Sequence, residues 1–149
     1  MDEALRRKVD HQTPEWVRDD AAFFITICAL HRGKNHLCHK VIGKAVLNSV
    51  VHYHEKQKWF CHIVVLMPDH VHFMLSFPDV TTFSNIVGDW KRWITTRHKI
   101  QWQENFFDHH VRNEDNDKWK GDYVFNNPVR AGFVESPEDW PYFWNPEAC

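Results

Sequence analysis

The sequence predicts an α+β fold in which an antiparallel sheet carries its helices on one face. Segments with the period of a strand alternate with segments with the period of a helix, in the order strand, helix, strand, strand, helix, strand, helix. The first six segments form a βαββαβ pattern, which is typical of antiparallel sheets with helices packed on one side. We expect the second face of the sheet to be comparatively open.

The elements of the first half follow from composition and spacing. Residues 1–21 are polar and charged, and we expect a loosely held N-terminal lead-in there. Residues 23–29 are rich in aromatic and β-branched side chains and predict the first strand. Apolar residues at helical spacing predict a helix over residues 39–56, and the run Ile-Val-Val-Leu predicts a buried strand over residues 59–66.

A tight turn is expected at Met67-Pro68-Asp69-His70, because proline fixes φ and aspartate hydrogen-bonds nearby backbone. The strand expected over residues 71–77 then forms a hairpin with the preceding one. A second amphipathic helix is expected over residues 82–98, and a short strand near residues 106–112. The acidic run 113–117 opens a third predicted helix that continues through Tyr123 toward Gly132. The length of the chain suits one hydrophobic core, and residues 22–149 are expected to form a single domain.

Composition restricts the function. The chain of 149 residues is 43% hydrophobic and 15% aromatic, which excludes a mostly disordered protein. Its net charge of −2 is not that of a generally basic nucleic-acid binder, so any nucleic acid must bind through a local patch. The four cysteines form no CxxC pair, and no secretory signal or membrane span is visible. We therefore expect a cytoplasmic protein with reduced thiols.

Two histidines provide the first candidate site. His70 and His72 are two residues apart on a predicted strand, so both imidazoles point to one side and could bind the same metal ion. They lie opposite the apolar face of that strand and would therefore face the open side of the sheet. His52 and His54 have the same spacing, but on a predicted helix they diverge by roughly 200°. A pair of ordinary surface histidines is the alternative interpretation of His70 and His72.

A tyrosine and an amide provide the second candidate site. On a continuous helix, Tyr123 and Asn127 lie on one face, one turn apart. Pro128 disfavours helical geometry at Asn127, so we also expect a kink there. The alternative is that Tyr123 is a half-buried core residue and that Asn127 and Pro128 only end the helix.

Basic residues interleaved with tryptophans could track a phosphate backbone. The alternative is a solvated helix face. The candidates for phosphate contacts are Lys91, Arg92, Arg97, Arg112 and Arg130.

These three features together suit the cleavage of a phosphodiester bond. A divalent ion held by His70 and His72 would withdraw charge from the scissile phosphate, and the hydroxyl of Tyr123 would attack the phosphorus. An unperturbed tyrosine has a pKa of about 10, so the phenol needs help from a cation or a base at neutral pH.

Two sequence blocks resemble a known family. Residues 66–75, Leu-Met-Pro-Asp-His-Val-His-Phe-Met-Leu, resemble the MPDHVH signature of the single-tyrosine HUH transposases. Residues 122–134, Asp-Tyr-Val-Phe-Asn-Asn-Pro-Val-Arg-Ala-Gly-Phe-Val, are similar to the YIxxNPVRAGLV block of the REP-associated tyrosine transposases, a branch of that superfamily. Residues 24–27 and 137–142 also resemble that branch. Both blocks in this order are strongly specific.

The resemblance implies a ferredoxin-like sheet with an additional C-terminal helix that carries the nucleophile. It implies that His70 and His72 ligate Mg²⁺ or Mn²⁺, with Asn127 as a third, amide-type ligand. Tyr123 would be the nucleophile that forms a 5′-phosphotyrosine link. The substrate would be single-stranded DNA near a hairpin, typically a palindromic repeat, and the origin bacterial.

Two other classes of function remain open at this stage. One is a non-catalytic module that binds single-stranded nucleic acid on the same sheet. The other is a small zinc protein that uses Cys61, His62 and His70, although these residues lack a paired ligand spacing. The sequence leaves open whether the protein is a monomer or a homodimer.

Overall fold

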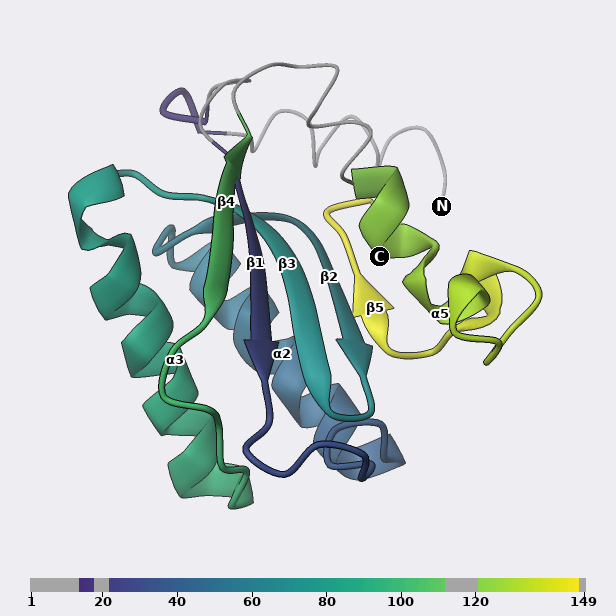
Figure 1. Ribbon diagram of the computed structural model, residues 1–149. Coiled ribbons are helices and arrows are strands. Elements are labelled where there is room, and N and C mark those ends of the chain that lie inside the picture. Colours follow the sequence, from purple (N-terminus) through teal and green to yellow (C-terminus); the bar gives the residue numbers. More distant parts are fainter. Residues whose placement is uncertain (1–13, 18–21, 112–120, 148–149) are drawn as a thin grey trace.

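The centre of the fold is a five-stranded antiparallel sheet in the order β4-β1-β3-β2-β5 (Figure 1). This computed structural model describes residues 14–17, 22–111 and 121–147. The strands are β1 (Ala22–Cys28), β2 (Phe60–Met67), β3 (His70–Ser76), β4 (Phe107–Val111) and β5 (Phe143–Trp144). The helices are α2 (Lys40–Glu55), α3 (Phe83–His98), the single turn α5 (Asn127–Arg130) and the 3-10 turns η1 (Val80–Thr82) and η2 (Pro137–Asp139).

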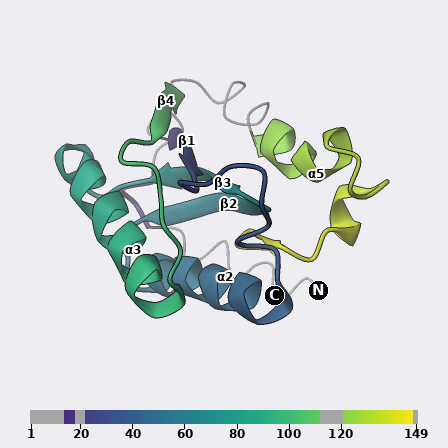
Figure 2. The same ribbon diagram turned by 60° about the horizontal axis from the view of Figure 1, so that its bottom comes forward.

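The main core lies between the sheet and the two long helices. Figure 2 shows α2 and α3 together on one side of the sheet. Alternate residues of β3 point toward them, and Val71, Phe73 and Leu75 are fully buried there. The indole N–H of Trp90 on α3 donates to the Ser49 hydroxyl on α2 at 2.9 Å, which joins the two helices inside this core.

The predicted α+β fold is confirmed. The first six elements occur in the βαββαβ order, and the order β4-β1-β3-β2 is that of a ferredoxin-like sheet. Their ends differ from the expected ones by a residue or two, as in α2, which was expected over residues 39–56. Residues 113–117, expected to open the third helix, lie outside the described residues. Of the expected lead-in, residues 1–21, the structure describes residues 14–17 only.

The second face of the sheet is not open as expected, because the C-terminal part of the chain covers part of it. Helical residues 121–125 and the segment that follows lie on the side away from α2 and α3 (Figure 2). Val124 is fully buried in a second apolar cluster there, against Met74 and Val65. The expectation failed because apolar side chains of the C-terminal segment, Val124 among them, are buried against this face.

A short strand that the sequence analysis did not identify closes the edge of β2. β5 pairs with Val64 and Val65, and the backbone N–H of Leu66 donates to the Tyr142 carbonyl at 2.8 Å. The Trp140 indole N–H donates to the Leu66 carbonyl at 2.9 Å. The C-terminal segment is therefore held on the end of β2 by main-chain and side-chain bonds. No helix among the described residues is long and apolar enough to cross a membrane.

Replacing each of two helical glycines with alanine is expected to change the stability in opposite directions. A Cβ at Gly43 on α2 would lie 2.6 Å from the Tyr142 ring, whereas one at Gly88 on α3 would meet its nearest atom, in the flexible Arg92 side chain, at 3.5 Å. We expect Gly43→Ala to lower the free energy of unfolding by about 1–2 kcal/mol, because the clash exceeds the gain in helix propensity. Gly88→Ala should raise it by about 0.5–1 kcal/mol.

Urea denaturation of the two variants measures both changes. Equal stabilisation by Gly43→Ala and Gly88→Ala would show that the Tyr142 ring does not restrict position 43.

Candidate functional site

The histidine pair lies at the start of β3, the strand at the centre of the sheet. His70 pairs with Cys28 on β1 and Met67 on β2, and His72 pairs with Thr26 and Val65. Because neighbouring strands fix the backbone on both sides, the two imidazoles leave the sheet from a rigid base. Both point away from the core under α2 and α3, as the alternation of β3 predicts.

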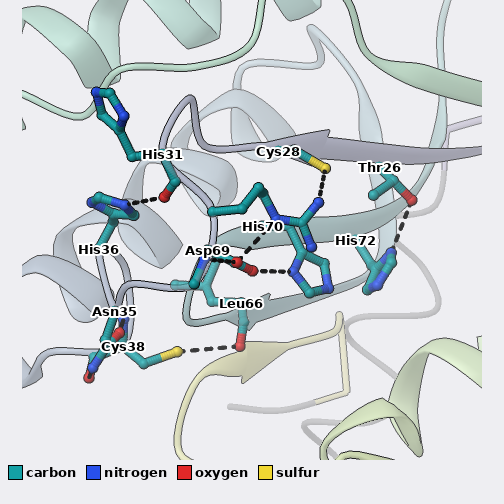
Figure 3. Close-up of polar contacts among 12 residues, drawn as sticks. Thr26, Cys28, His31, Asn35, His36, Cys38, Leu66, Asp69, His70 and His72 are labelled. Carbon is teal, nitrogen blue, oxygen red and sulfur yellow. Dashed lines mark hydrogen bonds and ion pairs between the residues drawn. The ribbon is translucent and has the colours of Figure 1, made fainter.

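Each imidazole is oriented through its Nδ1 atom. Nδ1 of His70 lies 2.8 Å from Oδ1 of Asp69, and Nδ1 of His72 lies 2.9 Å from the Thr26 hydroxyl (Figure 3). The ring centroids are 4.8 Å apart. Within the described residues, neither Nε2 atom makes a hydrogen bond. Because a carboxylate can only accept, His70 donates its Nδ1 proton to Asp69; the neutral form of the ring then has its lone pair on Nε2, which is the arrangement that metal-binding histidines use.

Asp69 holds this end of the sheet together. Its carboxylate accepts from the Gly33 backbone N–H at 2.8 Å and from Nε of Arg32 at 2.9 Å, in addition to His70. Burial alone would raise the pKa of Asp69, but these hydrogen bonds hold it well below its usual range. Gly33 has a φ of +87°, which suits glycine and lets the loop wrap around the carboxylate.

His72 is a neutral imidazole at physiological pH. Burial lowers the pKa of His72 to about 3, and the positive charges of His70, Arg130 and Arg32 act in the same direction. The ring also stacks on Phe24, with centroids 5.7 Å apart. Arg130 therefore comes close enough to this imidazole to act on its charge, although the two residues are far apart in sequence.

Tyr123 lies in the segment that covers this face of the sheet. It belongs to the helical residues 121–125, and its side chain is 43% exposed. The helix is interrupted at Asn126, and α5 begins at Asn127, which confirms the kink expected from Pro128. The guanidinium of Arg130 lies over the Tyr123 ring, with Cζ 3.8 Å from its centroid, and Nη2 donates to the Tyr123 carbonyl at 2.5 Å.

Asn127 occupies a different position from the one a continuous helix would give it. It is half-buried as the first residue of α5, beyond the turn that follows Tyr123. Among the described contacts, none joins its side chain to His70 or His72. Its role as a third ligand stays a prediction.

The other two tyrosines pack against apolar surface. The Tyr53 ring lies 4.8 Å from Trp59 beside the main core, and burial raises the pKa of its phenol. Tyr142 packs against Gly43 and Trp140. Tyr123 is the most exposed of the three.

The predicted basic residues do not form one patch. Lys91, Arg92 and Arg97 lie on α3, across the sheet from the histidines. Lys91 donates to the carbonyls of Gln103 and Glu104, Arg92 pairs with the exposed Asp89, and Arg97 lies 5.1 Å from the Trp93 ring centroid. Arg112 lies outside the described residues. Arg130 is thus the one predicted basic residue that the described structure brings to Tyr123.

The ligand set of the zinc-protein alternative does not assemble. Cys61 is fully buried under the helices, and the His62 Nε2 atom lies 2.8 Å from the Ser76 hydroxyl. The register places both at the opposite end of β2 from His70. Across the described residues, no three His, Cys, Asp or Glu side chains come together to hold a metal ion. Among these described side chains, a ligand set built on the histidine pair would therefore need another donor type, such as an amide.

The sequence analysis missed three residues that build the site. These are Thr26, on the strand predicted over residues 23–29, Asp69, in the predicted turn, and Arg32, none of which has a predicted role in the site. The position of Asp69 directly before His70 was a usable signal. Thr26 and Arg32 had none, because their contacts depend on the pairing of β1 with β3 and on the path of the loop after β1.

Loss of the Asp69 charge is expected to destabilise the fold. Asp69→Asn keeps the size of the side chain but weakens three hydrogen bonds at a position that is only 14% exposed. The free energy of unfolding should fall by about 1–3 kcal/mol. Asp89→Asn, which removes an exposed partner of Arg92, should change it by less than about 0.5 kcal/mol. Equal effects in urea denaturation would contradict the role of Asp69.

Known proteins similar to this chain carry one recurring name. A Haemophilus influenzae protein named "Putative REP-associated tyrosine transposase" is 26% identical over 139 residues, covering 80% of this chain and 77% of that protein. The REP-associated tyrosine transposase of Escherichia coli K12 is 31% identical over 81 residues, covering 52% of this chain and 49% of that protein. No protein-family model matches the chain.

The fold is also found in a solved structure. A REP-associated tyrosine transposase bound to a REP hairpin aligns with a TM-score of 0.70 at 22% identity, covering 89% of this chain and 81% of that one. Three observations point to the same proteins: the sequence similarity to two named relatives, the similarity in fold, and the two sequence blocks at residues 66–75 and 122–134. The chain is therefore similar to REP-associated tyrosine transposases in sequence and in fold.

Proposed function

We propose that this protein cleaves and rejoins single-stranded DNA next to a hairpin, through a covalent link between Tyr123 and a 5′-phosphate. The observation that carries the proposal is the orientation of the histidine pair. Both Nδ1 atoms are hydrogen-bonded to residues beneath them, and both Nε2 atoms remain without a hydrogen bond among the described residues. An exposed tyrosine lies in the segment that covers the same face of the sheet.

The residues present fit a divalent cation. His70 and His72 would hold it through Nε2, with Asn127 as a third, oxygen ligand, and Mg²⁺ or Mn²⁺ is the ion we propose. When bound, the cation would supply positive charge that stabilises the negative charge accumulating on the scissile phosphate. Asp69 and Thr26 would keep the imidazoles in the orientation that binding requires.

Tyr123 would carry out the covalent step. Its hydroxyl oxygen attacks the phosphorus and loses its proton, while the bond from phosphorus to the 3′-oxygen breaks. The departing 3′-oxygen takes up a proton, so the released strand ends in a 3′-hydroxyl. The tyrosyl phosphodiester retains the energy of the broken bond, so a bound 3′-hydroxyl can reverse the reaction and join strands without a nucleotide cofactor.

The charge distribution supports a local DNA site. The chain has a net charge of −2, yet the positive charge of Arg32 acts on the buried His72 imidazole. A phosphate near the histidines would therefore meet positive charge that the overall composition does not reveal. We propose that the protein acts in the bacterial cytoplasm. We also propose hairpin DNA as its substrate, because a similar protein was solved bound to a REP hairpin.

A non-catalytic module that binds single-stranded DNA is the second candidate. The net charge of −2 and the partial cover over the sheet face are compatible with it. It predicts binding without a covalent product, so the two candidates differ in one measurement.

Substitution of the tyrosine provides that measurement. Tyr123→Phe removes one oxygen from an exposed side chain and should leave the fold and DNA binding intact, while the covalent adduct disappears completely. Labelled hairpin oligonucleotides incubated with Mn²⁺ and separated on denaturing gels reveal the adduct. Tyr53→Phe and Tyr142→Phe should still form it. Wild-type protein that binds the oligonucleotides without any adduct would favour the module.

Metal binding can be tested without DNA. His72→Ala and His70→Ala should each abolish the binding of Mn²⁺ in titration calorimetry, and EDTA should stop adduct formation in the wild type. His52→Ala is the matched control, because this imidazole is exposed on α2. His54 is unsuitable, since its Nδ1 accepts from the Cys61 backbone N–H at 3.0 Å. Full adduct formation in EDTA would contradict the proposal.

A further inference from the structure

We propose that Arg130 is a positioning residue, which fixes both the main chain and the ring of Tyr123 so that the nucleophile is held in one orientation. The proposal rests on the proposed function in so far as Tyr123 is the nucleophile. It differs from the phosphate contact expected for Arg130 from the sequence, because the guanidinium is directed at the tyrosine itself.

The guanidinium makes two contacts with one residue. Nη2 donates to the Tyr123 carbonyl at 2.5 Å, and Cζ lies 3.8 Å from the centre of the ring. A planar guanidinium can stack on a ring and bond a carbonyl at the same time, which an ammonium group cannot do equally well. Main chain and ring of Tyr123 are thus held by the same group.

The break in the helix explains why the Tyr123 carbonyl receives a side-chain donor. Carbonyls in the last turn of a helix commonly accept hydrogen bonds from side chains, and Tyr123 lies in the last turn of the helical residues 121–125. Asn126 has φ −87° and ψ 0°, which ends the regular ladder. The Arg130 side chain reaches back across the turn to the Tyr123 carbonyl, seven residues earlier.

The base of Arg130 is itself fixed. Its backbone N–H donates to the Asn126 carbonyl at 3.1 Å, and the following N–H of Ala131 donates to the Asn127 carbonyl at 3.0 Å. Val124 and Pro128 are buried on either side of the turn. The backbone of Arg130 is therefore fixed. The contact with its side chain restricts the motion of Tyr123.

Such a contact matters for a nucleophile that is 43% exposed. A surface tyrosine samples several rotamers, and each rotamer away from the reactive one lowers the rate of attack. With the ring held against the guanidinium, the hydroxyl starts from one direction. This affects the rate of the covalent step and leaves the affinity for DNA to other residues.

The first test reads the ring directly and needs no activity. The chain has three tyrosines, so protein labelled with 3-fluorotyrosine should give three fluorine resonances, and Tyr123→Phe assigns that of Tyr123. Arg130→Met should shift the Tyr123 resonance and leave those of Tyr53 and Tyr142 in place. Lys44→Met, which removes an exposed cation on α2, should shift none. An unchanged Tyr123 resonance in Arg130→Met would overturn the proposal.

The second test separates positioning from phosphate binding. In single-turnover reactions on a labelled hairpin oligonucleotide, Arg130→Met should slow adduct formation by about 10- to 100-fold without changing the Kd for the DNA. Arg130→Lys should not restore the rate, because the ammonium lacks the planar group. A weaker Kd with a smaller salt dependence, restored by Arg130→Lys, would mean that Arg130 contacts a phosphate and would overturn the proposal.

The two proposals fail in different ways. If the wild type forms no adduct, the proposed function fails, while the fluorine shift still decides whether Arg130 holds the ring. If the wild type forms the adduct and Arg130→Met forms it at the same rate, only the inference about Arg130 fails.

Discussion

The site depends on the carboxylate of Asp69, which joins three parts of the chain at one end of the sheet. It receives hydrogen bonds from the loop after β1, through Arg32 and Gly33, and from His70 at the start of β3. The backbone carbonyl of the same residue accepts from the Ala29 N–H at 2.8 Å. A single turn between β2 and β3 thus fixes the loop, the strand end and one imidazole, so the geometry of the histidine pair follows from the hairpin.

The central strand serves two opposite environments. One row of its side chains fills the core beneath α2 and α3, and the other row carries the histidines and Met74. Because both neighbours of β3 are paired along its length, a shift in register would move both rows at once. The core therefore determines which residues face the site, and the site inherits the rigidity of the core.

Local patterns in the sequence predicted most of this arrangement, and contacts across the chain explain what they did not predict. The alternation of residues 71–77 correctly separated the histidine face from the core face, and Pro128 correctly predicted the kink. The cover over the sheet was not predicted, since burial of Val124 against Met74 joins segments fifty residues apart. Likewise, the pairing of Thr26 with His72 depends on tertiary placement, which spacing along the chain does not indicate. The stacking of Arg130 on Tyr123 is local, but it depends on the shape of the turn between them.

The close approach of Tyr142 to Gly43 links the two layers that lie on either side of β2. The helix beneath the sheet and the segment that returns over its edge meet where one residue has no side chain and the other has a large ring. The side chains at positions 43 and 142 would have to occupy the same space. Natural variation at either position should therefore be constrained by the other: a larger residue at 43 calls for a smaller one at 142. Lineages that change only one of them would lose the fit between the helix layer and the segment that carries β5.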